Sequence, residues 1–339
     1  MATHYTIRGG LDSTAVYKEE ETYNEGPTNW TSNAEHFGIT QSMTPSLSRN
    51  LIKSRGLMGI LPETNLVSTA RDAVNIRAGK SELTVEVEYQ PQHFSFLEYV
   101  FGSKSTSGTV TQYPQATAAS NADKRKYLNV PSIAIAQRFD FGGSADAAGQ
   151  VIEFLGLKVG SWSVEASIGD PVKCSASLTG GHVKVIADDD MTTHPLVALD
   201  TKDVFHFIDS EIKIGASELP NLIDGFKLNI NNNATGFGDI RSYVNEAVVV
   251  MGRDFNLTID MKLENTTYIK ALLGDATITE PSKIDTLTLE LDRTGHKIEI
   301  ILSNLKYADA LPGTTYGEVS NNNLTLEAER CYVKETITA

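Results

Sequence analysis

Apolar and polar residues alternate along many stretches of the chain, most regularly between Val204 and Leu263. Three runs carry this alternation, at 204–215, 226–233 and 257–263. Successive side chains of a β-strand point to opposite faces, so this pattern is typical of half-buried antiparallel strands. It predicts that this part of the protein is built mainly of β-strands.

One of these runs has a counterpart about half a chain length earlier. The sequence LTVEVEY at 83–89 corresponds to LTIDMKL at 257–263, an offset of 174 residues. Both runs follow a glycine and a basic residue, and both lead into a short apolar block that ends at Gly102 or Gly274. We interpret this as one β-rich module that occurs twice.

The pattern divides the chain into a polar N-terminal arm (1–30), a first module (31–185), a linker (186–200) and a second module (201–339). Apolar residues at helical spacing predict short helices at 94–101 and 267–273. Polar composition predicts a surface loop at 103–126. The predicted strands are 36–43, 83–89, 130–141, 150–159, 173–178, 204–215, 226–230, 247–251, 257–263, 286–291, 297–302 and 323–329.

A connection over 44–80 is too long for an ordinary hairpin loop, which takes about 2–5 residues. It carries six basic and two acidic residues, in a chain whose net charge is −14. A solvated basic loop and an interaction loop both fit this composition, and the apolar residues within it favour the interaction loop. The predicted contact residues are Arg49, Leu51, Ile52, Lys53, Arg55, Leu57 and Met58.

Composition narrows the class of protein. With 40% hydrophobic and 21% charged residues, the chain has the composition of a soluble globular protein made in the cytoplasm. It contains no apolar run of the roughly 18 residues that a membrane helix needs. The negative charge argues against a surface that grips nucleic acid, which requires clustered Lys and Arg. The same charge also fits a role in solubility alone.

The residue patterns of common enzymes and metal sites are missing from the sequence. There is no P-loop, nucleophile elbow or zinc-binding histidine pair among its motifs. The three aspartates at 188–190 are consecutive, unlike the spaced ligands of a calcium loop. We therefore expect no enzyme activity, no metal and no cofactor.

Several segments resemble the tail tube proteins of tailed bacteriophages and archaeal tailed viruses. They are the opening YKEEETY at 17–23, the runs 205–215 and 226–233, and the strand–helix unit that ends at Gly274. The resemblance implies two tandem tail-tube-type β-sandwich or barrel modules, each with a short flanking helix. It further implies a virion protein that binds itself, the tape measure, the tail terminator and the tail tip, with viral DNA passing through unbound and no membrane partner.

In that family, the strand face opposite the core lines the tube channel. By alternation, this face would carry Thr84, Glu86, Glu88, Thr258, Asp260 and Lys262, making the channel acidic overall. The family implies four channel strands per module. Twelve strands would close at a radius of about 12 Å, too tight for a DNA duplex about 20 Å across, whereas twenty-four give about 24 Å.

Six modules, hence three chains, are therefore expected in each ring. A hexamer with one module of each chain on the outside is the alternative. Other functions that the sequence leaves open are a carbohydrate- or receptor-binding β-sandwich and a component of the tail tip.

Overall fold

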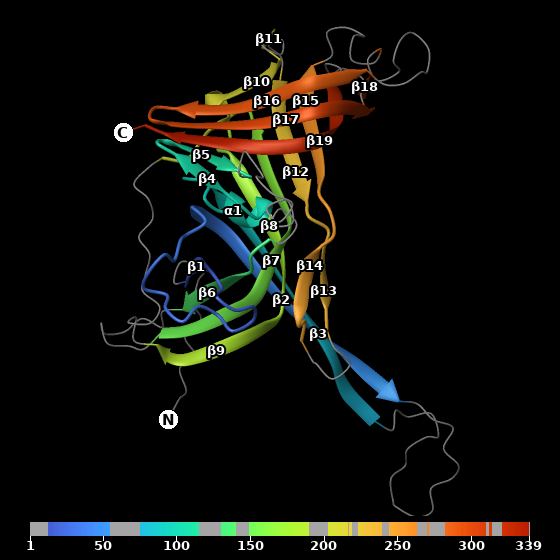
Figure 1. Ribbon diagram of the computed structural model, residues 1–339. Coiled ribbons are helices and arrows are strands. Elements are labelled where there is room, and N and C mark those ends of the chain that lie inside the picture. The colour runs from blue at the N-terminus through green and yellow to red at the C-terminus, as the bar shows by residue number, and fades with distance from the viewer. Residues whose placement is uncertain are drawn as a thin grey trace, which may run out of the picture.

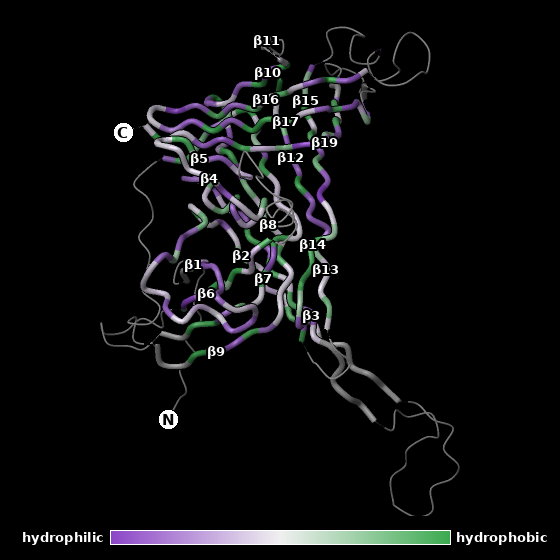
Figure 2. Tube along the Cα trace, viewed as in Figure 1, coloured by the Kyte–Doolittle hydropathy of each residue, from purple (hydrophilic) through white to green (hydrophobic). Residues whose placement is uncertain are grey.

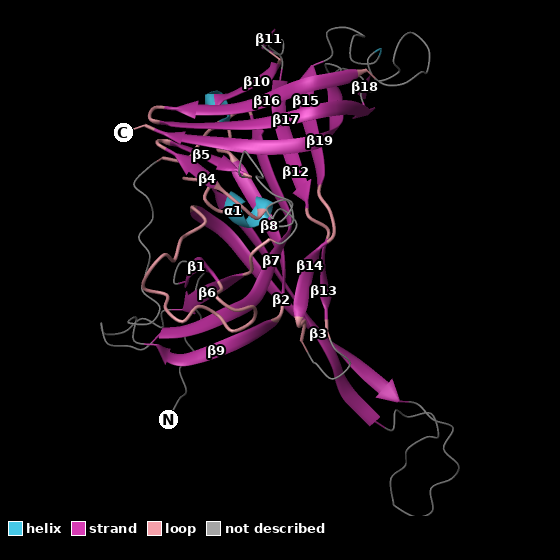
Figure 3. Cartoon of the chain, in the orientation of Figure 1, coloured by secondary structure: helices cyan, strands magenta, loops and turns pink. Residues whose placement is uncertain are grey.

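A computed structural model describes residues 13–54, 75–114, 130–139, 149–189, 203–215, 217–218, 223–238, 244–262, 270, 282–309, 312–313 and 321–338. The protein is mainly β, as the alternating pattern predicts, and its strands pair antiparallel (Figure 3). None of the described helices is long and apolar enough to span a membrane. Hydropathy alternates along many of the strands, so that each sheet has an apolar and a polar face (Figure 2).

The principal feature is a continuous run of eight paired strands to which both halves of the chain contribute four (Figure 1). Their order is β2 (Ile39–Ser54), β3 (Asn75–Gln90), β8 (Lys173–Gly180), β7 (Gly149–Ser167), β12 (Ile223–Asn231), β15 (Asp254–Lys262), β19 (Asn321–Ile337) and β17 (His296–Asp309). The two halves join where β7 pairs with β12.

Both halves use the same order of pairing. In the first half, β3 lies between β2 and β8, and Val85 pairs with Leu178. In the second half, β15 lies between β12 and β19, and Leu257 pairs with Leu326. The two similar sequence runs therefore occupy corresponding places in the sheet.

A second layer of strands covers the apolar face in each half. In the first half it consists of β1 (Ser13–Glu19), β6 (Ile133–Phe139), the start of β7, and β9 (His182–Asp189). In the second half it consists of β10 (Ser210–Ile214), β16 (Lys283–Arg293), the start of β17 and the end of β19. Two strands from the first half extend this layer, because β5 (Val110–Tyr113) pairs with the end of β19 and with β4 (Ser105–Ser107). Shorter strands are β11 (Ser217–Glu218), β13 (Ala234–Phe237), β14 (Ala247–Val250) and β18 (Pro312–Gly313).

The predicted first helix is present as α1 (Leu97–Phe101), which contacts β7 and β5. Leu97, Val100 and Phe101 are buried in the core. The helix ends at Gly102, whose φ of 80° is left-handed and whose N–H donates to the carbonyl of Glu98. Glycine adopts this conformation without steric cost, which explains why the helix stops there.

The predicted loop at 44–80 is wrong at both of its ends, and residues 55–74 lie outside the described residues. β2 continues to Ser54 and β3 begins at Asn75, and these two residues pair with each other. Arg49, Leu51, Ile52 and Lys53 therefore lie in β2, whereas Arg55, Leu57 and Met58 fall outside the described residues. Pro45 suggested a strand end, but among the described strands β2 pairs only with β3, and proline is tolerated on such an edge.

Other boundaries differ from the expectation. The strand expected at 204–215 begins only at Ser210, because Phe207–Asp209 forms a 3-10 turn in which Asp209 accepts a hydrogen bond from the His206 N–H. The expected surface loop at 103–126 contains β4 and β5. Part of the N-terminal arm forms β1, which pairs with β6, and part of the linker belongs to β9. The helix expected at 267–273 lies outside the described residues apart from Lys270.

Candidate functional site

The outward face of the eight-stranded sheet is polar from one edge to the other. Paired residues on neighbouring strands share a face, so the pairings trace a row across all eight strands. This row consists of Ser42, Glu88, Ser175, Ser163, Asn229, Asn256, Glu327 and Lys306. All of these side chains carry hydrogen-bonding groups, and apart from the buried Ser163 they are at least partly exposed, so the face has the chemistry of a hydrated surface.

The predicted channel-facing residues all lie on this face. Thr84, Glu86 and Glu88 are exposed on β3. On β15, Thr258, Asp260 and Lys262 have the same parity as Asn256 and therefore point to the same side of the sheet. The structure thus places both predicted sets on the same face of one sheet. Three strands, β8, β7 and β12, lie between β3 and β15.

Local charge pairs moderate the acidity of this face. Lys227 lies 2.8 Å from Glu165 across the junction between the halves, and Lys262 pairs with Asp224. Burial, followed by the nearby charge of Asp224, raises the pKa of Asp260. Exposed ion pairs of this kind contribute at most about 1 kcal/mol, so they shape the local charge more than the stability.

Sequence reasoning missed the residues that the central strands place on this face. Ser161, Ser163, Ser175, Ser177 and Asn229 come from β7, β8 and β12. The hydroxyls of Ser163 and Ser175 are 2.7 Å apart. The alternation within 173–178 carries the signal that could have identified Ser175 and Ser177.

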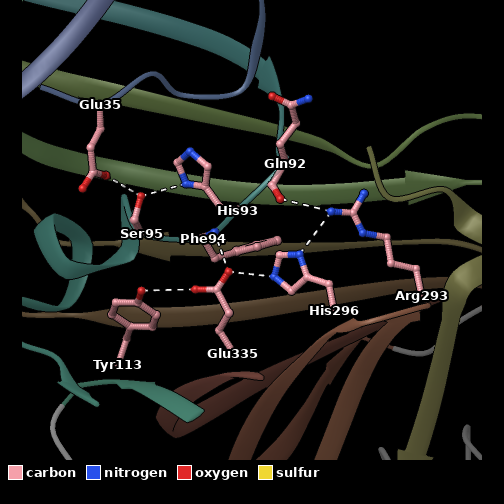
Figure 4. Close-up of polar contacts among 9 residues, drawn as sticks. All are labelled: Glu35, Gln92, His93, Phe94, Ser95, Tyr113, Arg293, His296 and Glu335. Carbon is pink, nitrogen blue, oxygen red and sulfur yellow. Dashed lines mark hydrogen bonds and ion pairs between the residues drawn. The ribbon is translucent and has the colours of Figure 1, made fainter. Parts of the chain in front are cut away.

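A buried polar network connects the two halves behind this sheet (Figure 4). At its centre, the Oε1 atom of Glu335 accepts hydrogen bonds from the backbone N–H of Phe94 at 3.1 Å and from the Nε2 of His296 at 2.8 Å. Its Oε2 atom accepts a third bond from the Tyr113 hydroxyl at 3.2 Å. Phe94 and Tyr113 belong to the first half, whereas His296 and Glu335 belong to the second.

The two ring nitrogens of His296 have different neighbours. An Arg293 nitrogen lies 3.1 Å from Nδ1, and because guanidinium can only donate, Nδ1 is the acceptor of that contact. Nε2 faces the Glu335 carboxylate. Arg293 also donates to the carbonyl of Gln92 at 3.2 Å and lies 4.3 Å from the centre of the Phe205 ring.

The electrostatics of Glu335 show that this network favours the ionised carboxylate. Burial by itself raises the pKa of Glu335, but the hydrogen bonds from His296 and from the Phe94 N–H outweigh that effect and lower it. A carboxylate held by several donors retains its charge even when it is buried. The network is thus a fixed structural junction.

A neighbouring set of polar residues superficially resembles a hydrolase site. The Ser95 hydroxyl lies 2.8 Å from the Nδ1 of His93 and 2.6 Å from a carboxylate oxygen of Glu35 (Figure 4). In a catalytic triad the histidine lies between the serine and the carboxylate, whereas here the serine lies between the other two. The arrangement positions Glu35, which also accepts a bond from the Tyr17 hydroxyl at 2.9 Å.

A family model described as phage tail tube protein matches residues 10–328. The chain belongs to the phage tail tube protein family. A search among curated proteins found no match. As a tail tube protein it is a structural component of the virion tail and not an enzyme, as the sequence led us to expect. The polar face and the buried network are therefore features of an assembling protein.

Proposed function

We propose that three copies of this protein form one ring of a tail tube, with eight strands from each copy closing a barrel of 24. The observation that carries the proposal is the continuous eight-stranded run to which each half gives four strands in the same order. Twenty-four tilted strands enclose a radius of about 24 Å, enough for hydrated duplex DNA.

The edge strand β2 and the repeated order of pairing support ring closure. In the described part of the chain, β2 forms one edge and pairs only with β3. The last strand of the run, β17, holds the place in the second half that β7 holds in the first, and the end of β7 pairs with β12. By analogy, the end of β17 pairs with β2 of the next copy, and closure covers the open edge of β2.

The polar face then lines the channel. Thr84, Glu86, Glu88, Thr258, Asp260 and Lys262 face the passing DNA, together with the serines and asparagines of the central strands. Carboxylates repel phosphate, and neutral hydroxyl and amide groups hold water, so the wall binds DNA weakly and lets it move. Genome delivery is the function of this surface.

We further propose modules at 31–185 and 201–339 joined by the linker 186–200, with β1 completing the first module. Each module is a β-sandwich with a short helix. The arm formed by β2 and β3, with Arg49, Leu51, Ile52, Lys53, Arg55, Leu57 and Met58, bridges successive rings. The partners are the tape measure, tail terminator and tail tip proteins, and the protein is made in the host cytoplasm before it enters the virion.

Negative-stain electron microscopy of the purified protein at rising concentration tests this function. We expect hollow tubes of uniform width whose rotational average shows threefold symmetry with a pseudo-sixfold wall. Dispersed globular particles at every concentration would contradict the tube. Six identical domain-sized protrusions outside each ring would contradict the trimer and favour a hexamer.

A further inference from the structure

A cleft of about 840 Å³ opens beside the first residue of β2. Its lining includes Gln92, Arg293 and His296, which belong to the buried network described above. Arg293 is held by the Gln92 carbonyl, by His296 and by the Phe205 ring. Figure 4 shows the first two of these contacts. This part of the lining is therefore preorganised and can support a binding surface without rearrangement.

Large aliphatic side chains are exposed around this cleft. Ile39 lines it and is 41% exposed. Ile208 is 90% exposed and lies between His206 and Asp209, which both line the cleft. Ile337 is also exposed and precedes Thr338, another lining residue. Single exposed aliphatic residues are ordinary, but several around one concavity mark an interaction surface.

The cleft and the β2–β3 arm occupy opposite ends of the same strand. Ile39 begins β2 at the cleft, and Ser54 ends it in the arm. A strand of 16 residues spans about 50 Å at roughly 3.3 Å per residue. In Figure 1 the arm extends away from the body of the protein. Two different surfaces at opposite ends are what head-to-tail stacking requires.

The two surfaces are complementary in composition. The arm strands 49–54 and 75–80 contain Arg49, Lys53, Arg77 and Lys80, together with Leu51, Ile52 and Ile76, and no acidic residue. The cleft offers the carboxylates of Asp203 and Asp209 beside the exposed isoleucines. A basic and apolar segment matches an acidic and apolar rim, and such complementarity sets the orientation of binding.

We propose that this cleft receives the β2–β3 arm of a second copy of the chain in the adjacent ring. The inference rests on the proposed stacking of rings and assigns the surface on which the arm docks. Each copy inserts its arm into one neighbour and accepts the arm of another, so the contact propagates along the tube and does not close on itself.

Site-directed crosslinking in assembled tubes tests the contact directly. The native thiols of Cys174 and Cys331 are buried, so an introduced cysteine is the reactive one. A variant with both Ser54→Cys and Asp203→Cys, treated with a short bis-maleimide, should give a ladder of dimers, trimers and longer chains. Each single variant should stay monomeric. The matched control is Ser54→Cys with Val185→Cys, at an exposed residue of β9, and it should give no ladder.

A second variant measures the apolar part of the contact. Ile208→Asp alters a side chain that is 90% exposed, so folding should be unaffected. It should raise the critical concentration for tube assembly by about tenfold or more, because a tenfold change corresponds to roughly 1.4 kcal/mol of contact energy. Val185→Asp, at another exposed aliphatic residue, should leave that concentration unchanged.

The outcomes separate this inference from the function on which it rests. Normal tubes from Ile208→Asp, with no ladder from the double-cysteine protein, would show that the arm docks elsewhere while the tube function stands. A ladder from the Val185 control alone would likewise overturn the docking site. If the unmodified protein forms no tubes at all, the proposed function fails and this inference fails with it.

Discussion

Glu335 shows how single residues hold the two halves of this protein together. Its carboxylate is buried, yet it is bound by donors from β17, from β5 and from the segment that precedes α1. A buried charge is costly unless its hydrogen bonds are satisfied, so all three partners must be in place at once. The network therefore couples the folding of one half to that of the other.

We predict that Glu335→Gln lowers the free energy of unfolding at pH 7 by about 3 kcal/mol, because an amide cannot replace a carboxylate that accepts from three donors. Urea denaturation measures this loss. Glu86→Gln, at an exposed position on β3, is the control and should change stability by less than about 0.5 kcal/mol. A Glu335→Gln protein as stable as the wild type would show that the network contributes nothing.

The same network predicts a pH dependence. The pKa of Glu335 is lower in the folded protein than its ordinary value of 4.5, so the unfolded chain binds the proton more readily. The stabilisation is present above pH 4.5 and disappears as the pH falls through the folded-state pKa. The difference in stability between wild type and Glu335→Gln should therefore shrink in acid.

At the scale of elements, the segment between β12 and β13 anchors the helix α1. Asn232 is fully buried, and its Nδ2 donates to the carbonyls of Val100 at 3.0 Å and Val159 at 3.1 Å. Its Oδ1 accepts from Arg253 at 2.8 Å. One side chain of the second half thus satisfies a carbonyl of α1 and another of β7, both in the first half.

Replacing Asn232 with alanine should lower the free energy of unfolding by about 3 kcal/mol, since it leaves two carbonyls and a guanidinium without this partner. Thermal unfolding followed by circular dichroism measures the change. Asn229→Ala, on the polar face of β12, should cost much less because water replaces its contacts. Equal losses from both variants would contradict the anchoring role of Asn232.

At the scale of the whole molecule, the eight-stranded sheet determines what the assembly encloses. Its polar face combines exposed carboxylates on β3 with paired charges at the junction of the halves. Under the proposed function, each ring presents this surface three times around the channel. The charge of the wall then controls how easily DNA slides past it.

Changing Glu86, Glu88 and Asp260 together to lysine should leave folding nearly intact, because these residues are exposed. It should slow or stop DNA ejection, since the wall would then attract phosphate. Ejection from purified virions measures the effect. The matched control replaces the same residues with Gln, Gln and Asn, and should eject far better than the lysine variant. Normal ejection with all three lysines would contradict the channel assignment.

Much of the fold was predictable from local pattern. Alternation in the runs 83–89 and 257–263 identified two strands and the faces on which their side chains lie, because a period of two is a property of the strand itself. The glycine after the apolar block at 94–101 predicted where the helix ends. The repeat also predicted that the halves correspond, and the pairings confirm this for the strands on either side of both runs.

Tertiary structure alone decided the features that depend on distant partners. Pro45 suggested a strand end, and only its place on an edge strand explains why β2 continues to Ser54. The network around Glu335 joins residues separated by up to 241 positions, and no local pattern encodes such contacts. The pairing of β7 with β12, which joins strands of both halves of the chain in one sheet, likewise depends on how the halves pack. Sequence periodicity determines what each strand can bury, whereas packing determines which strands meet.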